Sequence, residues 1–418
     1  MTTSASSRVA PPPHPQRRGA ADVAAARPAW LLAAPPVAVL VLIVALVLGG
    51  GAPEPPVSGL PDPGALTAWG LPVARLAFDL CAVGVLGTLV VTLLLPAEGW
   101  AASAAQTLRT ARWFASAWAC SAVAVVLLTV SDVLGVPLGA VLGSEGLLGY
   151  VWQLSQSRSL LLALACGVLV AGYSRWTVSR EGVAVLVAVA VAGLMPVLFA
   201  GHSAASSDHD LASSSLVVHV LGASVWVGGL FGVLLLRRRP QVLALVLPRY
   251  SAVALACFAA VAASGLINAW VRASSDLTAW VASGYAALLA VKLVALAALG
   301  VAGWWHRRRT LLAVSAGRPR AFARLATVEA LVMAATVAVA VALARTPPPA
   351  GAEVDIPSHG LGHPTLGSDV EPFGVGRLLT EWRLDAITLT VLAVAFGCYL
   401  AGWRRVRRAA AAGGVGGG

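Results

Sequence analysis

Residues 195–229 read MPVLFAGHSAASSDHDLASSSLVVHVLGASVWVGG, and this stretch decides the class of fold. Two apolar segments flank a short polar loop, and each belongs to a run long enough to cross a bilayer. His219 lies inside the second segment, whereas His202 and His209 lie at or within the loop. An imidazole in hydrocarbon is costly and usually faces a cavity, a partner or a metal. The stretch therefore predicts two membrane-spanning helices with a candidate metal site near their junction.

The composition agrees with a membrane protein. Hydrophobic residues make up 58% of the 418-residue chain and charged residues only 11%, and the mean hydropathy is +0.83. These values exclude an ordinary soluble domain. The net charge of +11 does not indicate a nucleic-acid partner, because the basic residues gather at the ends of apolar runs. The expected surroundings are membrane lipid.

The apolar runs are continuous and rich in Ala, Leu and Val, which favours helices over strands. We predict an all-α polytopic membrane helix bundle of about ten transmembrane helices. Their expected ranges are 29–50, 70–95, 110–134, 158–176, 181–200, 213–236, 249–271, 284–305, 322–344 and 384–403.

Arginine distribution predicts the orientation of the bundle. Every second connection between spans is rich in arginine, as at Arg237 to Arg239 and Arg307 to Arg309, and the connections between them are acidic. The positive-inside rule then places both termini in the cytoplasm and His202, His209, His359 and His363 on the outer side. We expect a multi-pass protein of the bacterial cell (inner) membrane.

The chain divides into five predicted parts. A disordered cytoplasmic arm (1–28) precedes a nine-span membrane domain (29–344), and an extracytoplasmic linker (345–376) leads to the tenth span (377–408) and a disordered tail (409–418). The run at 29–50 exceeds the h-region of a signal peptide, so we expect it to be a retained span.

Met195, His202 and His219 form the candidate metal site, with His209 as a weaker ligand at its entrance. Met195 lies two helical turns before His202, so both side chains point the same way. His219 is expected at about 9 Å below the outer surface, close to the depth of Met195 on the preceding helix. Imidazole together with thioether suits copper, and Cu(I) in particular. The alternative interpretation is that these histidines are satisfied core residues.

Ionisable residues inside the spans are the second signal. Lys292 is the chain's only lysine, and Asp79 lies at a comparable depth, so the two are candidate ion-pair partners. The pair would either fix helix register or take part in transport. For Glu329 a structural role is favoured, and Asn268 is expected to form a hydrogen bond between helices. His306 opens a basic stretch at a cytoplasmic helix end, where a cation is favourable.

Several motifs resemble the copper-resistance D (CopD) family. They are Gly201-His202, His219, Val225-Trp226-Val227-Gly228-Gly229, Ser264-Gly265-Leu266 with Asn268, Tyr285-x-x-Leu288-Leu289-x-x-Lys292, and His306-Arg307-Arg308. The resemblance covers about residues 195–345. It implies an inner-membrane protein that moves extracytoplasmic copper inward, often received from a small CopC-type carrier. By position it makes His202 and His219 copper ligands and puts Asn268 and Lys292 in the helix core.

The segment from Leu378 to Arg408 resembles the opening of a CtaG-type cytochrome oxidase assembly domain. Three functions therefore stay open. The first is copper binding with transport or delivery to a copper-requiring client. The second is a haem b redox protein with His202 or His219 as axial ligand. The third is a scaffold for cytochrome oxidase assembly partners. The chain has no P-loop, dinucleotide-binding or HExxH motif, and we do not expect an enzyme.

Overall fold

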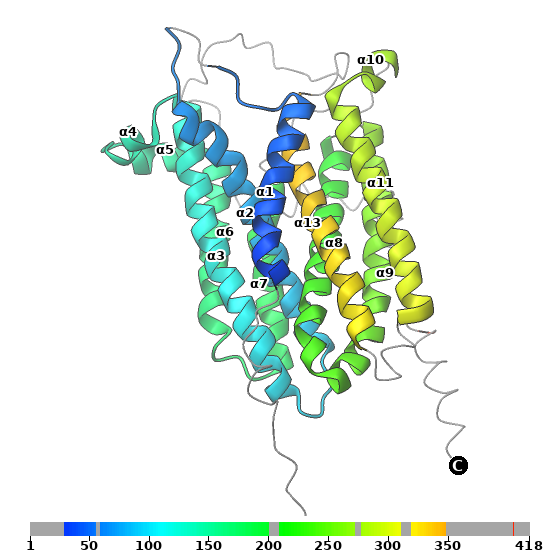
Figure 1. Ribbon diagram of the computed structural model, residues 1–418. Helices are drawn as coiled ribbons and strands as arrows, with labels where there is room; N and C mark the ends of the chain where they lie inside the picture. Colours follow the sequence, from blue (N-terminus) through cyan, green and yellow to red (C-terminus); the bar gives the residue numbers. More distant parts are fainter. Residues whose placement is uncertain are drawn as a thin grey trace, which may run out of the picture.

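The computed structural model describes residues 29–55, 59–199, 209–271, 277–310, 319–347 and 404, and no strand occurs in these ranges. Long helices run side by side along one axis (Figure 1). Their bounds are α1 (Ala29–Gly49), α2 (Gly64–Leu94), α3 (Trp100–Leu134), α6 (Ser155–Tyr173), α7 (Arg180–Phe199), α8 (His209–Leu235), α9 (Pro240–Val271), α11 (Gly284–Trp305) and α13 (Pro319–Leu343). The predicted all-α bundle is confirmed.

Shorter elements lie at the two ends of the bundle. Figure 1 shows α4 (Leu138–Leu142), α5 (Leu147–Gln153) and α10 (Leu277–Val281) at the upper end. A 3₁₀ turn, η2 (Leu236–Arg238), joins α8 to α9, and a π turn, η3 (His306–Thr310), follows α11. Both of these turns carry arginine.

Eight helices in the described part of the chain are long and apolar enough to cross a membrane. They correspond to the second through ninth predicted spans. The first corresponds to α1, whose apolar stretch Ala34–Gly49 is shorter, and the tenth lies outside the described residues. Three predicted starts were wrong, since α2 begins at Gly64, α3 at Trp100 and α9 at Pro240. Arg109, which precedes the predicted span 110–134, therefore lies within α3.

Helix α2 is the central element and contacts α1, α3, α7, α8, α9 and α13. Its closest approach is to α8, where a Cβ on Gly87 would overlap the backbone of Gly228, and a Cβ on Gly228 would overlap the carbonyl of Val83. Small residues let membrane helices approach in this way, and packing then holds them. The glycines of the Val-Trp-Val-Gly-Gly motif therefore allow the close crossing of α8 and α2.

Hydrogen bonds between buried hydroxyl groups fix α2 against α3 at both ends. Thr67 and Ser131 are 2.7 Å apart at one end, and Thr92 donates to Thr107 over 2.7 Å at the other. Such bonds between membrane helices contribute about 0.6 kcal/mol on average. They set the register of two helices whose apolar faces alone would leave it loosely defined.

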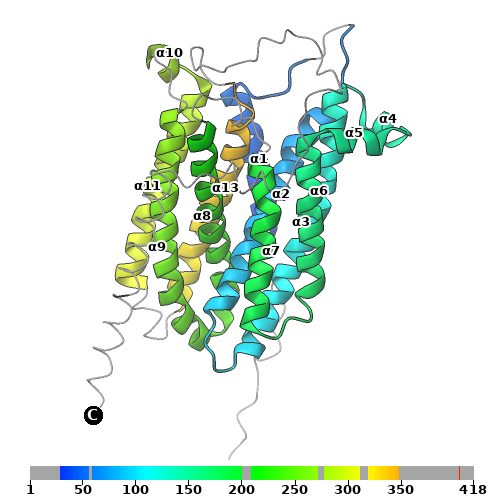
Figure 2. The ribbon, with the colours of Figure 1, turned by 180° about the vertical axis from the view of Figure 1, so that it is seen from behind.

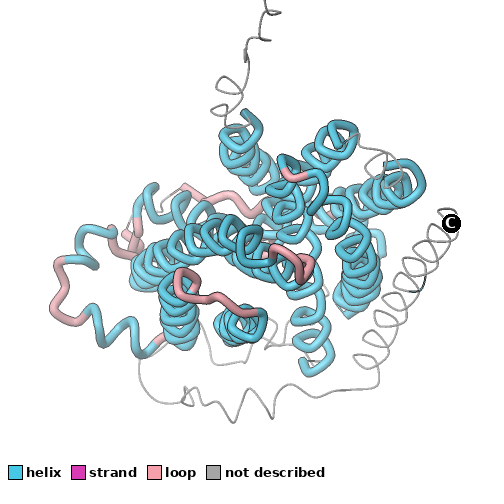
Figure 3. Tube along the Cα trace, turned by 90° about the horizontal axis from the view of Figure 1, so that it is seen from below, coloured by secondary structure: helices cyan, strands magenta, loops and turns pink. Residues whose placement is uncertain are grey.

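Apolar side chains cover the outside of the bundle. Trp270 is 80% exposed and Val294 70% exposed, on α9 and α11 respectively. Figure 2 shows these two helices at one edge of the bundle, away from α3 and α6, and Figure 3 shows the helices of the described residues from below. Large apolar surfaces of this kind are stable against lipid tails but not against water. The protein is therefore a multi-pass membrane protein.

The arginine-rich turns lie together at the end of the bundle opposite α4, α5 and α10 (Figures 1 and 2). Some of these arginines also stabilise helix ends. Arg249 donates to the carbonyl of Leu94 over 2.8 Å, and Arg180 donates to that of Leu95 over 2.6 Å. The last carbonyls of α2 have no partner within the helix, so the two guanidinium groups cap its C-terminus.

Candidate functional site

His219 lies on α8 with its imidazole turned toward α9. Its Nδ1 is 3.2 Å from the hydroxyl oxygen of Ser264. Gly265 leaves the room for the ring, because a Cβ there would stand 3.2 Å from Cε1 of the imidazole. The Ser264-Gly265 pair noted in the sequence therefore forms the surface of α9 against which the His219 imidazole packs.

The hydroxyl of Ser264 determines which ring nitrogen is protonated. The Ser264 hydroxyl donates a hydrogen bond of 2.5 Å to the carbonyl of Ala260. Its oxygen then has lone pairs left for an N–H, so Nδ1 of His219 donates and Nε2 keeps the lone pair. Metal-binding histidines are commonly oriented in this way, with one ring N–H held by an oxygen acceptor.

A second contact between α8 and α9 lies one helical turn away. The side-chain amide of Asn268 donates to the hydroxyl of Ser215 over 2.8 Å and to the carbonyl of Ser264 over 3.0 Å. The interhelical hydrogen bond expected of Asn268 is confirmed. Ser215 precedes His219 by four residues and Asn268 follows Ser264 by four, so the two contacts form consecutive rungs between antiparallel helices.

The other three candidate ligands are only partly placed. Met195 is half-buried near the end of α7. His209 is the first residue of α8, and its side chain is not described; His202 lies outside the described residues, as do His359 and His363. Convergence of Met195, His202 and His219 stays a prediction.

The arrangement of α7 and α8 differs from a simple hairpin. Helix α8 packs mainly on α2 and α9, and α7 packs mainly on α6 and α2. Helix α2 therefore contacts both α7 and α8. The Nδ1 edge of the His219 imidazole faces α9 rather than α7. The sequence could not reveal this, because it shows which helices are consecutive but not which ones touch.

The ion pair expected between Asp79 and Lys292 stays a prediction. Asp79 pairs with Arg75, one turn earlier in α2, at an N–O distance of 3.4 Å. The positive charge of Lys292, on α11, also contributes to the electrostatic surroundings of His219. Arg75 could have been found from the sequence, because a spacing of four residues places opposite charges side by side on a helix.

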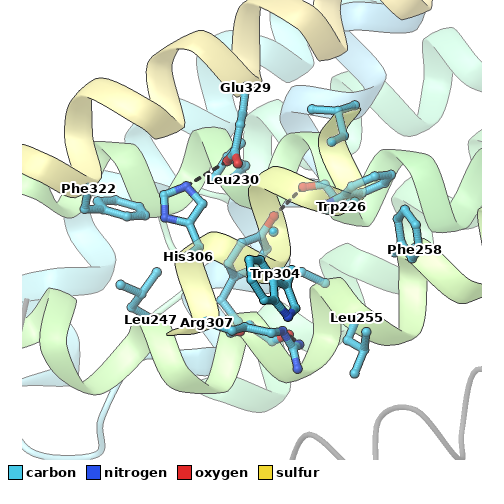
Figure 4. A pocket seen from close by; sticks show the side chains of 16 residues that line it. Trp226, Leu230, Leu247, Leu255, Phe258, Trp304, His306, Arg307, Phe322 and Glu329 are labelled. Carbon is cyan, nitrogen blue, oxygen red and sulfur yellow. Dashed lines mark hydrogen bonds and ion pairs between the residues drawn. The ribbon is translucent and has the colours of Figure 1, made fainter. Parts of the chain in front are cut away.

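The sequence also missed a pairing at the arginine-rich end. Nε2 of His306 lies 3.0 Å from Oε2 of Glu329, and these side chains are only 15% and 8% exposed. They were considered separately, since 23 residues and the turn between α11 and α13 separate them. Figure 4 shows the pair beside a cavity of about 280 Å³.

Among the described residues, no three His, Cys, Asp or Glu side chains gather where they could hold a metal ion. A metal site that includes His219 would therefore need Met195 or residues beyond the described ranges. A soft monovalent ion such as Cu(I) is compatible with such a site, because thioether sulfur is a suitable ligand for it.

Residues 244–343 match the family model of copper resistance protein D. This part of the chain is similar to the CopD family, and the match supports the resemblance over these residues. The match runs from α9 to the last residue of α13 and contains Ser264, Asn268 and Lys292, whereas His219 precedes it. No curated protein and no solved structure matches the chain.

The CopD match confirms the resemblance seen in the sequence. Together with the helix bundle, it describes a multi-pass membrane protein in which residues 244–343 are similar to copper resistance protein D. The matched residues supply the α9 side of the contact with His219, and they also supply both members of the His306–Glu329 pair. The segment that resembles a CtaG-type domain lies beyond the match and outside the described residues.

Proposed function

We propose that this protein binds copper at the extracytoplasmic face of the bacterial inner membrane and passes it toward the cytoplasm or to a copper-requiring client. The observation that carries the proposal is the orientation of His219 by Ser264, a residue of the CopD match. Copper is the cargo in this proposal rather than a resident cofactor, and no enzymatic step is involved.

The donor chemistry of His219 supports copper. With its proton on Nδ1, the imidazole offers the Nε2 lone pair, which is a good ligand for Cu(I) and a poor one for Mg²⁺ or Ca²⁺. Met195, His202 and His209 are the proposed further ligands, and the order in which they bind copper follows their expected depth in the membrane. His209 would meet copper first, and Met195 and His219 would hold it deeper.

Lys292 gives the proposed site a means of release. A positive charge that acts on His219 also repels a cation bound there. We propose that Lys292 weakens copper binding enough for the ion to leave. This role agrees with transport, in which a site must release its cargo as well as bind it.

The partners follow from the orientation proposed above. Both termini and the arginine-rich turns would face the cytoplasm. A CopC-type carrier would then deliver copper at the opposite end of the bundle, where α4, α5 and α10 lie. Cytochrome oxidase assembly partners are the proposed clients of a delivery role.

Copper content of purified variants tests the proposal. We expect His219→Ala to lose most of the high-affinity copper, His202→Ala nearly as much, and His209→Ala only to load more slowly. Lys292→Met is expected to retain copper longer after a chelator is added. His14→Ala is the matched control, since this histidine belongs to the predicted N-terminal arm.

Three outcomes would contradict the proposal. Unchanged copper content in both His202→Ala and His219→Ala would remove the site. An intense Soret band in the wild-type protein that either substitution abolishes would instead assign these histidines to haem b. A protein that contains neither ligand, and whose loss leaves cellular copper unchanged, would support the scaffold function.

A further inference from the structure

The cavity beside His306 and Glu329 lies between α8, α9, α11 and α13. Its lining is mostly apolar and includes five aromatic side chains: Trp226, Tyr250, Phe258, Trp304 and Phe322. Trp226 and Phe258 meet edge to face, with ring centroids 5.4 Å apart. At about 280 Å³, the space holds one small ring system rather than a lipid chain.

Two buried polar atoms at this cavity have no hydrogen-bond partner. They are Nδ1 of His306 and Oε1 of Glu329, whose other polar atoms bond to each other. A carboxylate only accepts hydrogen bonds, so Nε2–H of His306 donates to Oε2. Oε1 thus remains an acceptor that needs a donor. Leaving a buried charged oxygen unpaired costs more than about 1 kcal/mol, and a ligand hydroxyl would remove that cost.

The charges around the cavity favour a neutral ligand. Glu329 contributes one negative charge to the lining and Arg307 one positive charge. Arg307 is already held by a bond to the carbonyl of Ser251. The two opposite charges of the lining therefore give no net attraction for a cation or an anion. A charged ligand would still lose its hydration in this mostly apolar cavity, and a neutral molecule does not meet that cost.

We propose that this cavity binds the headgroup of a membrane-soluble quinol, a neutral flat ring that carries hydroxyl donors. The ring would lie among the aromatic side chains, which prefer offset or edge-to-face contacts with another ring. One hydroxyl would donate to Oε1 of Glu329. The cavity lies at the arginine-rich end of the bundle, and α9 and α11, which line it, expose apolar side chains that lipid would cover.

Gly303 of α11 allows the cavity to be filled by a substitution that leaves the fold intact. Gly303 lines the cavity, and a Cβ there would meet no heavy atom within 4 Å. Gly303→Leu should therefore fill the cavity without a clash. Gly172 on α6 has the same free surroundings away from the cavity, so Gly172→Leu is the matched control. Ala254→Leu fills the cavity from α9 if Gly303→Leu does not accumulate.

The probe is duroquinol, a tetramethyl hydroquinone, added anaerobically to purified protein in lipid nanodiscs. We expect it to raise the thermal unfolding midpoint of the wild type and of Gly172→Leu in proportion to its concentration, as a ligand of the folded state does. The rise should be absent in the cavity-filling variants. An equal rise in those variants, or none in the wild type, would overturn the proposal.

The oxidised probe tests the role of Glu329. Duroquinone has acceptors only, so we expect at least tenfold weaker binding than for duroquinol. Glu329→Gln introduces an amide donor and should remove this preference. A wild-type protein that binds both forms equally would contradict the hydrogen bond to Oε1, and so would a preference that survives in Glu329→Gln.

Discussion

The hydroxyl oxygen of Ser264 lies 3.2 Å from Nδ1 of His219, and the same hydroxyl donates a hydrogen bond to the carbonyl of Ala260. This relationship connects the CopD match on α9 with a histidine that precedes it in the chain. It also defines what each residue contributes, since Ser264 orients the imidazole and His219 offers the lone pair.

Ser264→Ala is expected to weaken copper binding by about tenfold, the lower end of the effect seen when a partner of a ligand histidine is removed. Ser264→Thr keeps a hydroxyl at the same position and should restore the affinity. The measurement is a copper titration of the purified protein against a competing chelator.

Asn268→Ala is the matched control for that titration. It removes the neighbouring rung with Ser215 and leaves the Ser264 hydroxyl in place. Its copper affinity should stay close to that of the wild type. If Asn268→Ala weakens copper binding as much as Ser264→Ala, then the contact between α8 and α9 matters as packing and Ser264 has no orienting role.

Gly228→Ala is expected to destabilise the bundle by about 3 kcal/mol, because the added methyl group meets the carbonyl of Val83 and the backbone of Gly87. Thermal unfolding followed by size-exclusion chromatography measures the loss. Gly172→Ala should cause none, since no heavy atom lies within 4 Å of the new Cβ. Equal stability of the two variants would argue against the close crossing of α2 and α8.

The ion pair on α2 predicts a specific pattern of coupling. A double-mutant cycle on Arg75→Met and Asp79→Asn should give a coupling free energy of about 0.5 kcal/mol, as for a pair spaced by four residues on a helix. The same cycle on Asp79→Asn and Lys292→Met should give a value near zero. A larger coupling in the second cycle would establish Lys292 as a partner of Asp79.

The proposed orientation predicts which connections are reached from outside the cell. Leu148 on α5 and Val178 after α6 are each 82% exposed, and they lie at opposite ends of α6. In a protein whose native cysteines are replaced by alanine, a membrane-impermeant maleimide should label Leu148→Cys on whole cells. Val178→Cys should be labelled only after permeabilisation. The reverse pattern would invert the topology.

Much of the fold follows from local properties of the chain. Continuous apolar runs predict spanning helices because an unpaired backbone polar group is too costly in hydrocarbon. The nine helices from α1 to α13 that match predicted spans were found in this way. Boundaries were less accurate, as at α3, because a helix can continue into the headgroup region and beyond without a change in its hydrogen bonding.

The candidate site was predicted less completely. His219 and Asn268 were singled out because polar side chains inside apolar runs stand out in any sequence. Ser264 was noted only as part of a CopD-like motif and Ser215 was not noted at all, since a serine is common in a membrane helix and its role depends on the facing helix. Likewise His306 and Glu329 were each noticed, but nothing in the chain between them indicates that they pair.

The sequence alone determined the class of fold, the order of the spans and the side of the bundle that carries arginine. These properties depend on residue type and on neighbours a few positions away. Only the tertiary structure decided which helices touch: α8 on α2 and α9, Arg249 on the end of α2, and Glu329 on His306. The reason is physical. Lipid accepts any apolar helix face equally well, so glycine crossings and a few hydrogen bonds between distant residues select the neighbours.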